Sequence, residues 1–237
     1  ESCPMILAKC SHDLDILNFL VGSHCTRLTS YGSLAFFNAE NRPAGAADRC
    51  MNCPLSDSCI YSAKSYYFRL LRSGNLGWPL DVLTHDLTEK GVAEALENGP
   101  YGRCVFACDN DVVDNQVINF EYEGGVTGSM TMTAFSDKCC RETEFRGTLG
   151  EIHGDGNEIR VRKFGSGIET VFDVNMLGQS LAGGHGGGDI RLAQDFIDLV
   201  SGQTPSISCT MLSDSINGHR IGFAAEKARK TQTIIPL

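Results

Sequence analysis

The stretch 117-VINFEYEGGVTGSMTMTAF-135 decides how this chain folds. Apolar and polar residues alternate over 117–122 and again over 126–135, and Glu123-Gly124-Gly125 between them is a turn sequence. Alternation with a period of two places the side chains of a strand on opposite faces, so the stretch predicts an antiparallel β-hairpin. Strand patterns continue through 142–148, 150–154, 158–164 and 168–174, which predicts a block of consecutive antiparallel strands.

Helical patterns stand on both sides of this block. Apolar residues recur at helical spacing from Leu14 onward, and a strand over 25–37 follows. We expect an α+β fold, with one large open, mostly antiparallel sheet and helices packed on one face. The whole of 1–237 is interpreted as a single domain. Further helices are predicted over 60–71, 88–97 (capped by Thr88), 190–200 and 211–230, strands or buried extended segments over 4–7 and 78–83, and a final strand over 233–235.

Composition and charge argue against several classes of protein. The 237 residues are 42% hydrophobic and 21% charged, as in an ordinary globular chain, and the net charge is −9. Proteins that bind nucleic acid or anionic membranes depend on clustered Lys and Arg, so we expect neither partner. The sequence has no apolar run of about 18 residues and no opening signal peptide, which favours a cytoplasmic protein. Glu1 in place of an initiator methionine predicts a processed or excised chain.

The first helix begins beside a group of reactive side chains. Lys9, Cys10, His12 and Asp15 lie within seven residues of one another, and Asp13 suits the cap or first turn of a helix. Proton transfer needs a group that titrates near neutrality, and histidine does so without perturbation. His12 is therefore a candidate acid or base. The alternative is a half-buried, hydrogen-bonded histidine that only packs.

Eleven cysteines are a high and odd number for a chain of this size. Cys50, Cys53 and Cys59 form a C-x2-C-x5-C pattern in a long loop, a spacing that allows thiolates to share one tetrahedral zinc ion. Cys104 or Cys108 would supply a fourth ligand. A disulfide or redox pair and free thiols are the alternatives. Because several cysteines lie within apolar segments, a reduced compartment is expected.

Two further segments are candidates for ligand binding. Asp109, Asn110 and Asp111 gather carboxylates and an amide before a strand; such groups bind a hard cation or the hydroxyls of a polyol, and an ordinary turn is the alternative. The segment 178–189 is dense in glycine and contains His185. Glycine lets the backbone approach a ligand or another subunit closely, which makes His185 a second candidate polar group. A flexible linker is the alternative.

The strand at 129–133 predicts an interface between subunits. Its sequence, SMTMT, alternates Met with Ser and Thr, so one face of the sheet would be half apolar. An antiparallel sheet with helices on one face leaves the other face to solvent or to a partner. We therefore expect a homo-oligomer that forms through this sheet face.

Several segments, which together cover nearly the whole chain, carry a resemblance to a known family: 9-KCSHDLD-15, 101-YGRC-104, 108-CDND-111, 145-FRGTLGE-151, 186-GGGD-189 and 218-GHRIGFAAEKAR-229. In this order they resemble the C-terminal domain of the Gfo/Idh/MocA family of NAD(P)-dependent oxidoreductases. The resemblance implies a substrate-binding and oligomerisation domain with an open antiparallel sheet, preceded in family members by a Rossmann domain that holds NAD or NADP. That domain's glycine fingerprint and Glu-Lys-Pro motif are not in this sequence, so we expect the chain alone to bind no cofactor and to be inactive.

Residue by residue, the resemblance assigns roles to side chains. His12 matches the family's catalytic histidine, which exchanges a proton with the substrate hydroxyl, and Asp15 completes an H-x-x-D pattern. Family members often carry an Asp at the position of Ala8; here Lys9, one residue on, would supply the missing polar group. Further contacts to sugar hydroxyls would come from Asp109, Asn110, Asp111 and His185.

The sequence thus favours the substrate-binding half of a sugar or polyol dehydrogenase, with His12 as the acid/base group. The alternative is a cofactor-free interaction and oligomerisation module with a structural cysteine cluster. A zinc enzyme built on the cysteines is a third hypothesis, although closely spaced cysteines more often make a closed structural site.

Overall fold

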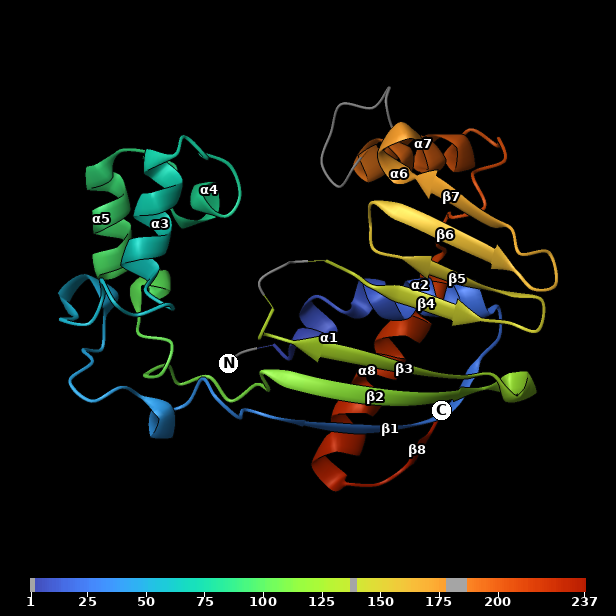
Figure 1. Ribbon diagram of the computed structural model, residues 1–237, viewed down its shortest axis with the longest axis horizontal. Coiled ribbons are helices and arrows are strands. Elements are labelled where there is room, and N and C mark those ends of the chain that lie inside the picture. Colours follow the sequence, from blue (N-terminus) through green and yellow to red (C-terminus); the bar gives the residue numbers. More distant parts are fainter. Residues whose placement is uncertain (1–2, 137–139, 178–186) are drawn as a thin grey trace. The chain divides into compact units, whose positions relative to one another are not determined.

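The computed structural model describes residues 3–136, 140–177 and 187–237. The chain divides into two units (Figure 1): the first comprises Glu1–Phe135 and Asn217–Leu237, and the second Ser136–Ile216. Among the described residues, the named strands form one four-stranded antiparallel sheet in each unit.

The first sheet is built around the predicted hairpin. Each strand is antiparallel to its neighbours, in the order β3-β2-β1-β8. The strands are β1 (Cys25–Ser33), β2 (Asn115–Tyr122), β3 (Thr127–Thr133) and β8 (Ile235–Pro236). The turn η4 (Glu123–Gly125) joins β2 to β3, and its Gly124 has a φ of 81°, in the left-handed region that glycine adopts without strain. The hairpin prediction is confirmed.

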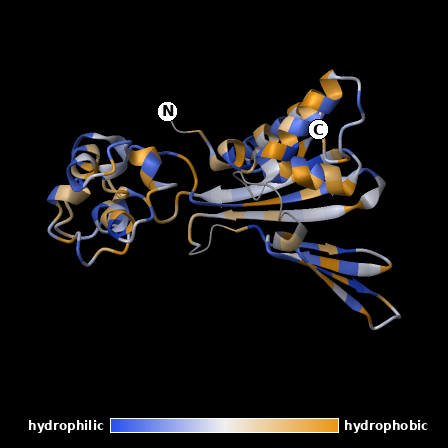
Figure 2. Cartoon of the chain, turned by 90° about the horizontal axis from the view of Figure 1, so that it is seen from above, coloured by the Kyte–Doolittle hydropathy of each residue, from blue (hydrophilic) through white to orange (hydrophobic). Residues whose placement is uncertain are grey.

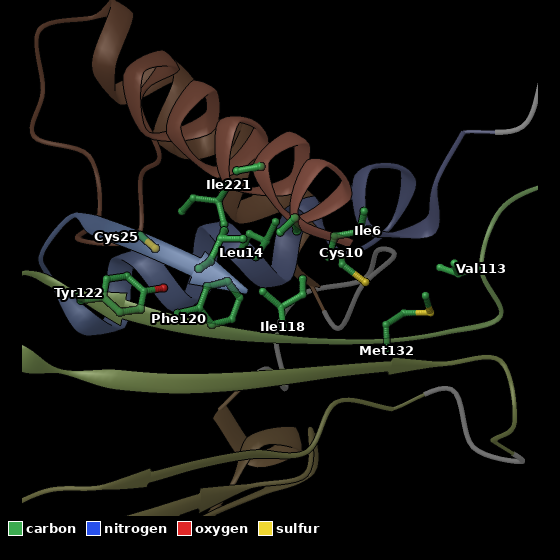
Figure 3. Packing of buried hydrophobic residues seen from close by; sticks show 14 residues of the cluster. Ile6, Cys10, Leu14, Cys25, Val113, Ile118, Phe120, Tyr122, Met132 and Ile221 are labelled. Carbon is green, nitrogen blue, oxygen red and sulfur yellow. The ribbon is translucent and has the colours of Figure 1, made fainter. Parts of the chain in front are cut away.

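Three helices cover one face of this sheet: α1 (Met5–Ala8), α2 (Ser11–Val21) and α8 (Leu212–Thr231). Every second residue of β2, from 116 to 122, is buried, as the alternation of side chains along a strand requires. The apolar core lies between the helices and the sheet (Figure 3). Its buried members include Ile6, Leu14, Leu28, Ile118, Phe120, Tyr122 and Ile221.

A polar network is buried beside this core. Gln116 on β2 donates from Nε2 to Ser30 Oγ at 3.0 Å and to Glu226 Oε1 at 3.2 Å. Arg229, three residues further along α8, donates from Nη2 to Glu226 Oε2 at 2.7 Å. A buried carboxylate is tolerated only when partners of this kind replace its water. The network therefore ties the central strand to α8.

A helical insertion separates β1 from β2. Leu80, Val92 and Leu96 form its own small buried cluster. Its helix α5 (Glu89–Asn98) is capped by Thr88, whose side chain accepts from the N–H of Gly91, as predicted. The insertion contains α3 (Ala63–Arg72), α4 (Leu80–Leu83), α5 (Glu89–Asn98) and the 3-10 turns η1 (Ala39–Asn41), η2 (Cys50–Asn52) and η3 (Pro100–Gly102).

The second unit holds its own antiparallel sheet, in the order β4-β5-β6-β7. Hydrophobic and hydrophilic residues alternate along its strands (Figure 2). Apolar side chains such as Val171, Phe172 and Phe196 are exposed. The elements are β4 (Thr143–Arg146), β5 (Gly150–Gly154), β6 (Glu158–Lys163), β7 (Glu169–Asp173), α6 (Val174–Leu177) and α7 (Gly188–Val200).

The α+β class, with antiparallel sheets and helices against a sheet face, is confirmed, but the number of sheets differs from the prediction. The sequence pattern predicted one large sheet, whereas the described strands make two sheets of four. The reason is that β4 to β7 pair in succession with one another, so no described β3–β4 ladder extends the first sheet. The prediction that residues 1–237 form a single domain stays a prediction.

Two short segments predicted as extended are helical. Met5–Ala8 and Leu80–Leu83 are α1 and α4, and each follows a proline, Pro4 or Pro79, in the N-cap position. Proline is well tolerated at the start of a helix because its missing N–H would have no partner there. None of the helices in the described ranges combines the length and apolar character needed to cross a membrane.

Replacement of Ile221 by alanine should destabilise the first unit strongly. Ile221 on α8 is 0% exposed, so the change leaves a cavity and the free energy of unfolding should fall by about 2–5 kcal/mol. Ile216 on the same helix is 52% exposed and is the matched control; I216A should change stability by less than about 0.5 kcal/mol. Urea denaturation followed by circular dichroism measures both. Equal losses would contradict the assigned core.

Candidate functional site

The predicted acid/base residues lie at the turn between α1 and α2. Lys9 is the C-cap residue of α1, and Cys10 is the N-cap residue of α2. Cys10 is buried in the core and anchors the turn, whereas Lys9 and His12 are exposed. His12 and Asp15 are three residues apart on α2 and so share one side of the helix. The structure thus brings Lys9, His12 and Asp15 to one helix start.

Close packing of α8 fixes the backbone of this turn. A Cβ atom at Gly218 would lie 3.6 Å from the backbone N of Asp15. At Gly222, one helical turn later, a Cβ would lie 2.6 Å from Cδ2 of Leu7, which is closer than real Cβ contacts. The contact at Gly218 is an ordinary van der Waals distance, whereas at Gly222 the missing Cβ lets α8 approach the Leu7 side chain of α1 closely.

The second predicted polar group, residues 109–111, lies in the loop before β2, and two of its side chains form hydrogen bonds with residues of the same loop. Arg103 donates from Nη2 to Oδ1 of Asp109 at 2.7 Å, which lowers the pKa of that carboxyl and raises the pKa of the guanidinium. Asn110 closes a turn, because its Oδ1 accepts from the N–H of Val112 at 3.3 Å. Asp111 is exposed. Contacts from these three residues to a sugar stay a prediction, and a sugar hydroxyl would compete with Arg103 for Asp109.

His185 lies outside the described residues, as does most of the glycine-dense segment. The described chain resumes at Gly187, whose φ of 87° suits glycine, and α7 starts at Gly188. The role of His185 in ligand binding stays a prediction.

The three predicted zinc ligands line the same cavity, but they do not form a coordination site there. Cys50, Cys53 and Cys59 line one cavity of about 20 Å³, and Cys104 lines it too. All four are free thiols, so no disulfide joins them. Burial raises the pKa of the Cys50 thiol above its ordinary value. Within the described ranges, no three His, Cys, Asp or Glu side chains stand in a ready coordination arrangement, so no preformed site supports the predicted zinc ion.

Asp114 is a structural anchor that the sequence reasoning missed. It is 4% exposed, and its carboxylate accepts from the backbone N–H groups of Ala35 at 3.0 Å, Phe36 at 2.8 Å and Phe37 at 3.1 Å. Burial acts to raise the pKa of Asp114, but these hydrogen bonds outweigh it and lower the pKa below its ordinary value. The available signal is alternation, which places Asp114 on the same buried face of the chain as Gln116.

The segment held by Asp114 carries an aromatic cluster. Ring centroids of neighbouring members lie 5.1 to 6.1 Å apart, and several pairs meet edge to face. This packing explains why β1 ends at Ser33, where a strand to residue 37 was predicted: the chain turns away to place two phenylalanines in the cluster. The members are Phe36, Phe37, Tyr61, Phe106 and Phe135.

Comparison with known proteins identifies the fold. No family model and no curated protein matches this sequence. Among solved structures, an oxidoreductase domain protein from Kribbella flavida aligns with 98% of this chain at 12% identity, with a TM-score of 0.57. Levoglucosan dehydrogenase in complex with NADH and levoglucosan aligns with 97% at 15% identity, with a TM-score of 0.54. The super-repressor mutant of Gal80p from Saccharomyces cerevisiae aligns with 98% at 13% identity, with a TM-score of 0.56.

This chain spans about half the length of the structures it matches, covering 50%, 49% and 49% of the three in the same order. The similarity extends over nearly all of this chain and confirms the resemblance to the Gfo/Idh/MocA oxidoreductases at the level of fold. At such low identity the fold is what is shared, and a fold alone does not fix a function.

Removal of the Asp114 carboxylate should destabilise the first unit. In D114A three backbone N–H groups lose a buried acceptor, so the free energy of unfolding at neutral pH should fall by about 2–4 kcal/mol. D111A removes an exposed carboxylate from the same loop and should stay within about 0.5 kcal/mol of the wild type. Chemical denaturation measures both. Similar losses in the two variants would show that these hydrogen bonds do not stabilise the fold.

The same carboxylate should make stability sensitive to acid. Its pKa is lower in the folded than in the unfolded chain, so its stabilisation is complete above the unfolded pKa of about 3.9 and is lost as pH falls through the folded pKa. The difference in unfolding free energy between the wild type and D114A should therefore shrink in denaturation series carried below about pH 4. A difference that stays constant with pH would contradict this assignment.

Proposed function

We propose that this chain is the substrate-binding half of an NAD(P)-dependent oxidoreductase that acts on a sugar or polyol. The observation that carries the proposal is the shared fold: 97% of the chain aligns with about half of levoglucosan dehydrogenase, whose structure holds NADH and levoglucosan. A titratable side chain, His12, is exposed at a helix start whose backbone is held by the core, and this adds chemical support.

The nicotinamide cofactor would be bound outside these 237 residues. Rossmann domains bind dinucleotides on a parallel sheet, with G-x-G-x-x-G between a strand and a helix. This sequence has no such fingerprint, and the strand pairs of the described residues are antiparallel. The residues present therefore do not fit a dinucleotide, and we assign to them only the binding and orientation of the alcohol. That the isolated chain binds no NAD(P) stays a prediction.

His12 would act as the acid/base group on the substrate hydroxyl. A neutral imidazole accepts the O–H proton as an alcohol is oxidised to a carbonyl, and the imidazolium returns that proton when the carbonyl is reduced. His12 is exposed in the first turn of α2, which gives the ring access to a substrate. Asp15, on the same side of α2, would orient the imidazole, and Lys9 would donate a hydrogen bond to a neighbouring hydroxyl of the sugar.

A second candidate function is a non-catalytic interaction and oligomerisation module. The similarity to the super-repressor mutant of Gal80p favours it, because the same fold occurs in a repressor. The homo-oligomer through the sheet face stays a proposal under either function. On β3, Met132 is buried in the core and Met130 packs against it, so the half-apolar outer face predicted from this strand is wrong. Ser129, Thr131 and Thr133 are exposed, and the outward side of the strand offers hydroxyl groups to a partner.

The first experiment measures nucleotide binding and alcohol oxidation by the intact protein in which this chain occurs. Titration with NADH and NADPH should show saturable binding, and a panel of sugars and polyols should support reduction of NAD or NADP. H12A should lower kcat by about 10²–10⁴-fold, because the base is lost, without changing nucleotide binding. H24A removes an exposed histidine just after the same helix and should keep full activity.

Three outcomes separate the hypotheses. If neither nucleotide binds the intact protein, the oxidoreductase proposal fails, and self-association in sedimentation without polyol binding would support the interaction module. If nucleotide and sugar are turned over but H12A is as active as H24A, the oxidoreductase assignment stands and the role given to His12 is wrong. A strict monomer at micromolar concentration would remove the homo-oligomer.

A further inference from the structure

Four cysteines line a single cavity in the helical insertion, which we call the four-cysteine cavity: Cys50, Cys53, Cys59 and Cys104. Its volume is about 20 Å³, room for one water-sized sphere. Cys50 and Cys104 are buried, and the rest of the wall is mainly apolar, including the buried Phe106. A space of this size accommodates a single ion.

Backbone hydrogen bonds bring Cys104 beside Cys50, although the two are far apart in the sequence. Arg49 and Arg103 form an isolated antiparallel bridge, and the N–H of Cys104 donates to the carbonyl O of Asp48 at 2.8 Å. Each cysteine directly follows one member of this bridge. The pairing of two backbone segments therefore carries both thiols to the same cavity.

Tight turns place the other two thiols. The N–H of Cys53 donates to the carbonyl O of Cys50 at 3.3 Å, which closes the 3-10 turn η2. The N–H of Cys59 donates to the carbonyl O of Leu55 at 2.9 Å, so the chain turns back toward the cavity before α3 begins. The segment with the C-x2-C-x5-C spacing thus folds into two tight turns, and cysteines with such close spacing are common in structural zinc sites.

The helix α3 begins beside the cavity, because Ser62, its N-cap residue, lines the cavity together with Cys50. The positive end of a helix dipole favours negative charge nearby, such as that of metal-bound thiolates.

Other uses of these thiols fit the geometry less well. A reactive or redox-sensing cysteine needs solvent access, but Cys50 and Cys104 are only 7% and 8% exposed. Cys108 faces elsewhere, since its Sγ donates to the carbonyl O of Cys104 at 3.3 Å. A closed set of four thiols leaves no position for a catalytic water, which is the arrangement of a structural metal site.

We propose that Cys50, Cys53, Cys59 and Cys104 bind one structural zinc ion. The described side chains hold no ready coordination arrangement, so the ion would draw the sulfurs inward, by rotation about the Cα–Cβ bonds, to Zn–S distances of about 2.3 Å. Four thiols lose their protons to solvent as four Zn–S bonds form. The ion joins the loop before α3 to the segment at Arg103, and this inference is independent of the oxidoreductase proposal.

The zinc content of the intact protein, purified under reducing conditions, tests this site. Elemental analysis should find about one zinc per chain in the wild type. C104S should lose most of the zinc, whereas C108S, which changes the neighbouring cysteine outside the four-cysteine cavity, should keep it. Protein without zinc, iron in place of zinc, or equal loss of zinc in the two variants would overturn the proposal.

Cobalt replacement in the wild-type protein provides a measurement that does not depend on the folding of C104S. After removal of the native metal by a chelator, added Co²⁺ should give sulfur-to-cobalt charge-transfer absorption and the strong visible bands of a tetrahedral site. Alkylation under native conditions should label Cys53 and Cys59, which are partly exposed, faster after chelation than before. Absence of the cobalt spectrum together with unchanged alkylation would overturn the site.

Discussion

The burial of one face of β2 beneath α2 and α8 is the constraint on which the first unit depends. Ile118, Phe120 and Tyr122 lie on that face, and β1 and β3 pair with the two edges of the same strand. Because side chains alternate along a strand, a register slip of one residue would expose all three at once. The turn that carries His12 is held by the same core through the buried Cys10. The position of the candidate site therefore follows from the packing beneath it.

Signals within a few residues carry most of what the sequence predicts about the fold. The hairpin of β2 and β3 and the cap at Thr88 are of this kind, because turn and cap preferences act locally. A segment of four mostly apolar residues fits a strand or a helix equally well, so the helices after Pro4 and Pro79 are not predictable from periodicity. Alternation of polar and apolar residues identifies a strand but does not show which strand pairs with it. The division of the strands into two sheets therefore could not be predicted from the sequence pattern.

The candidate sites divide in the same way. Lys9, His12 and Asp15 are neighbours in the sequence, so their proximity follows from one helix start. Cys104 reaches Cys50 only because distant backbone segments pair, and a linear motif does not encode that pairing. Asp114 is hidden for a related reason: its hydrogen-bond partners are backbone groups at 35–37, and backbone groups leave no residue signature.

The buried network of Gln116, Glu226 and Arg229 constrains how this protein can diverge. Gln116 reaches Glu226 from the central strand, and Arg229 balances the charge from the helix. Loss of any one partner leaves a buried polar or charged group unmatched, and that penalty is a large part of the stability of an ordinary domain. Viable lineages should therefore replace the three residues together or keep all three, so that a strand position and two helix positions co-evolve.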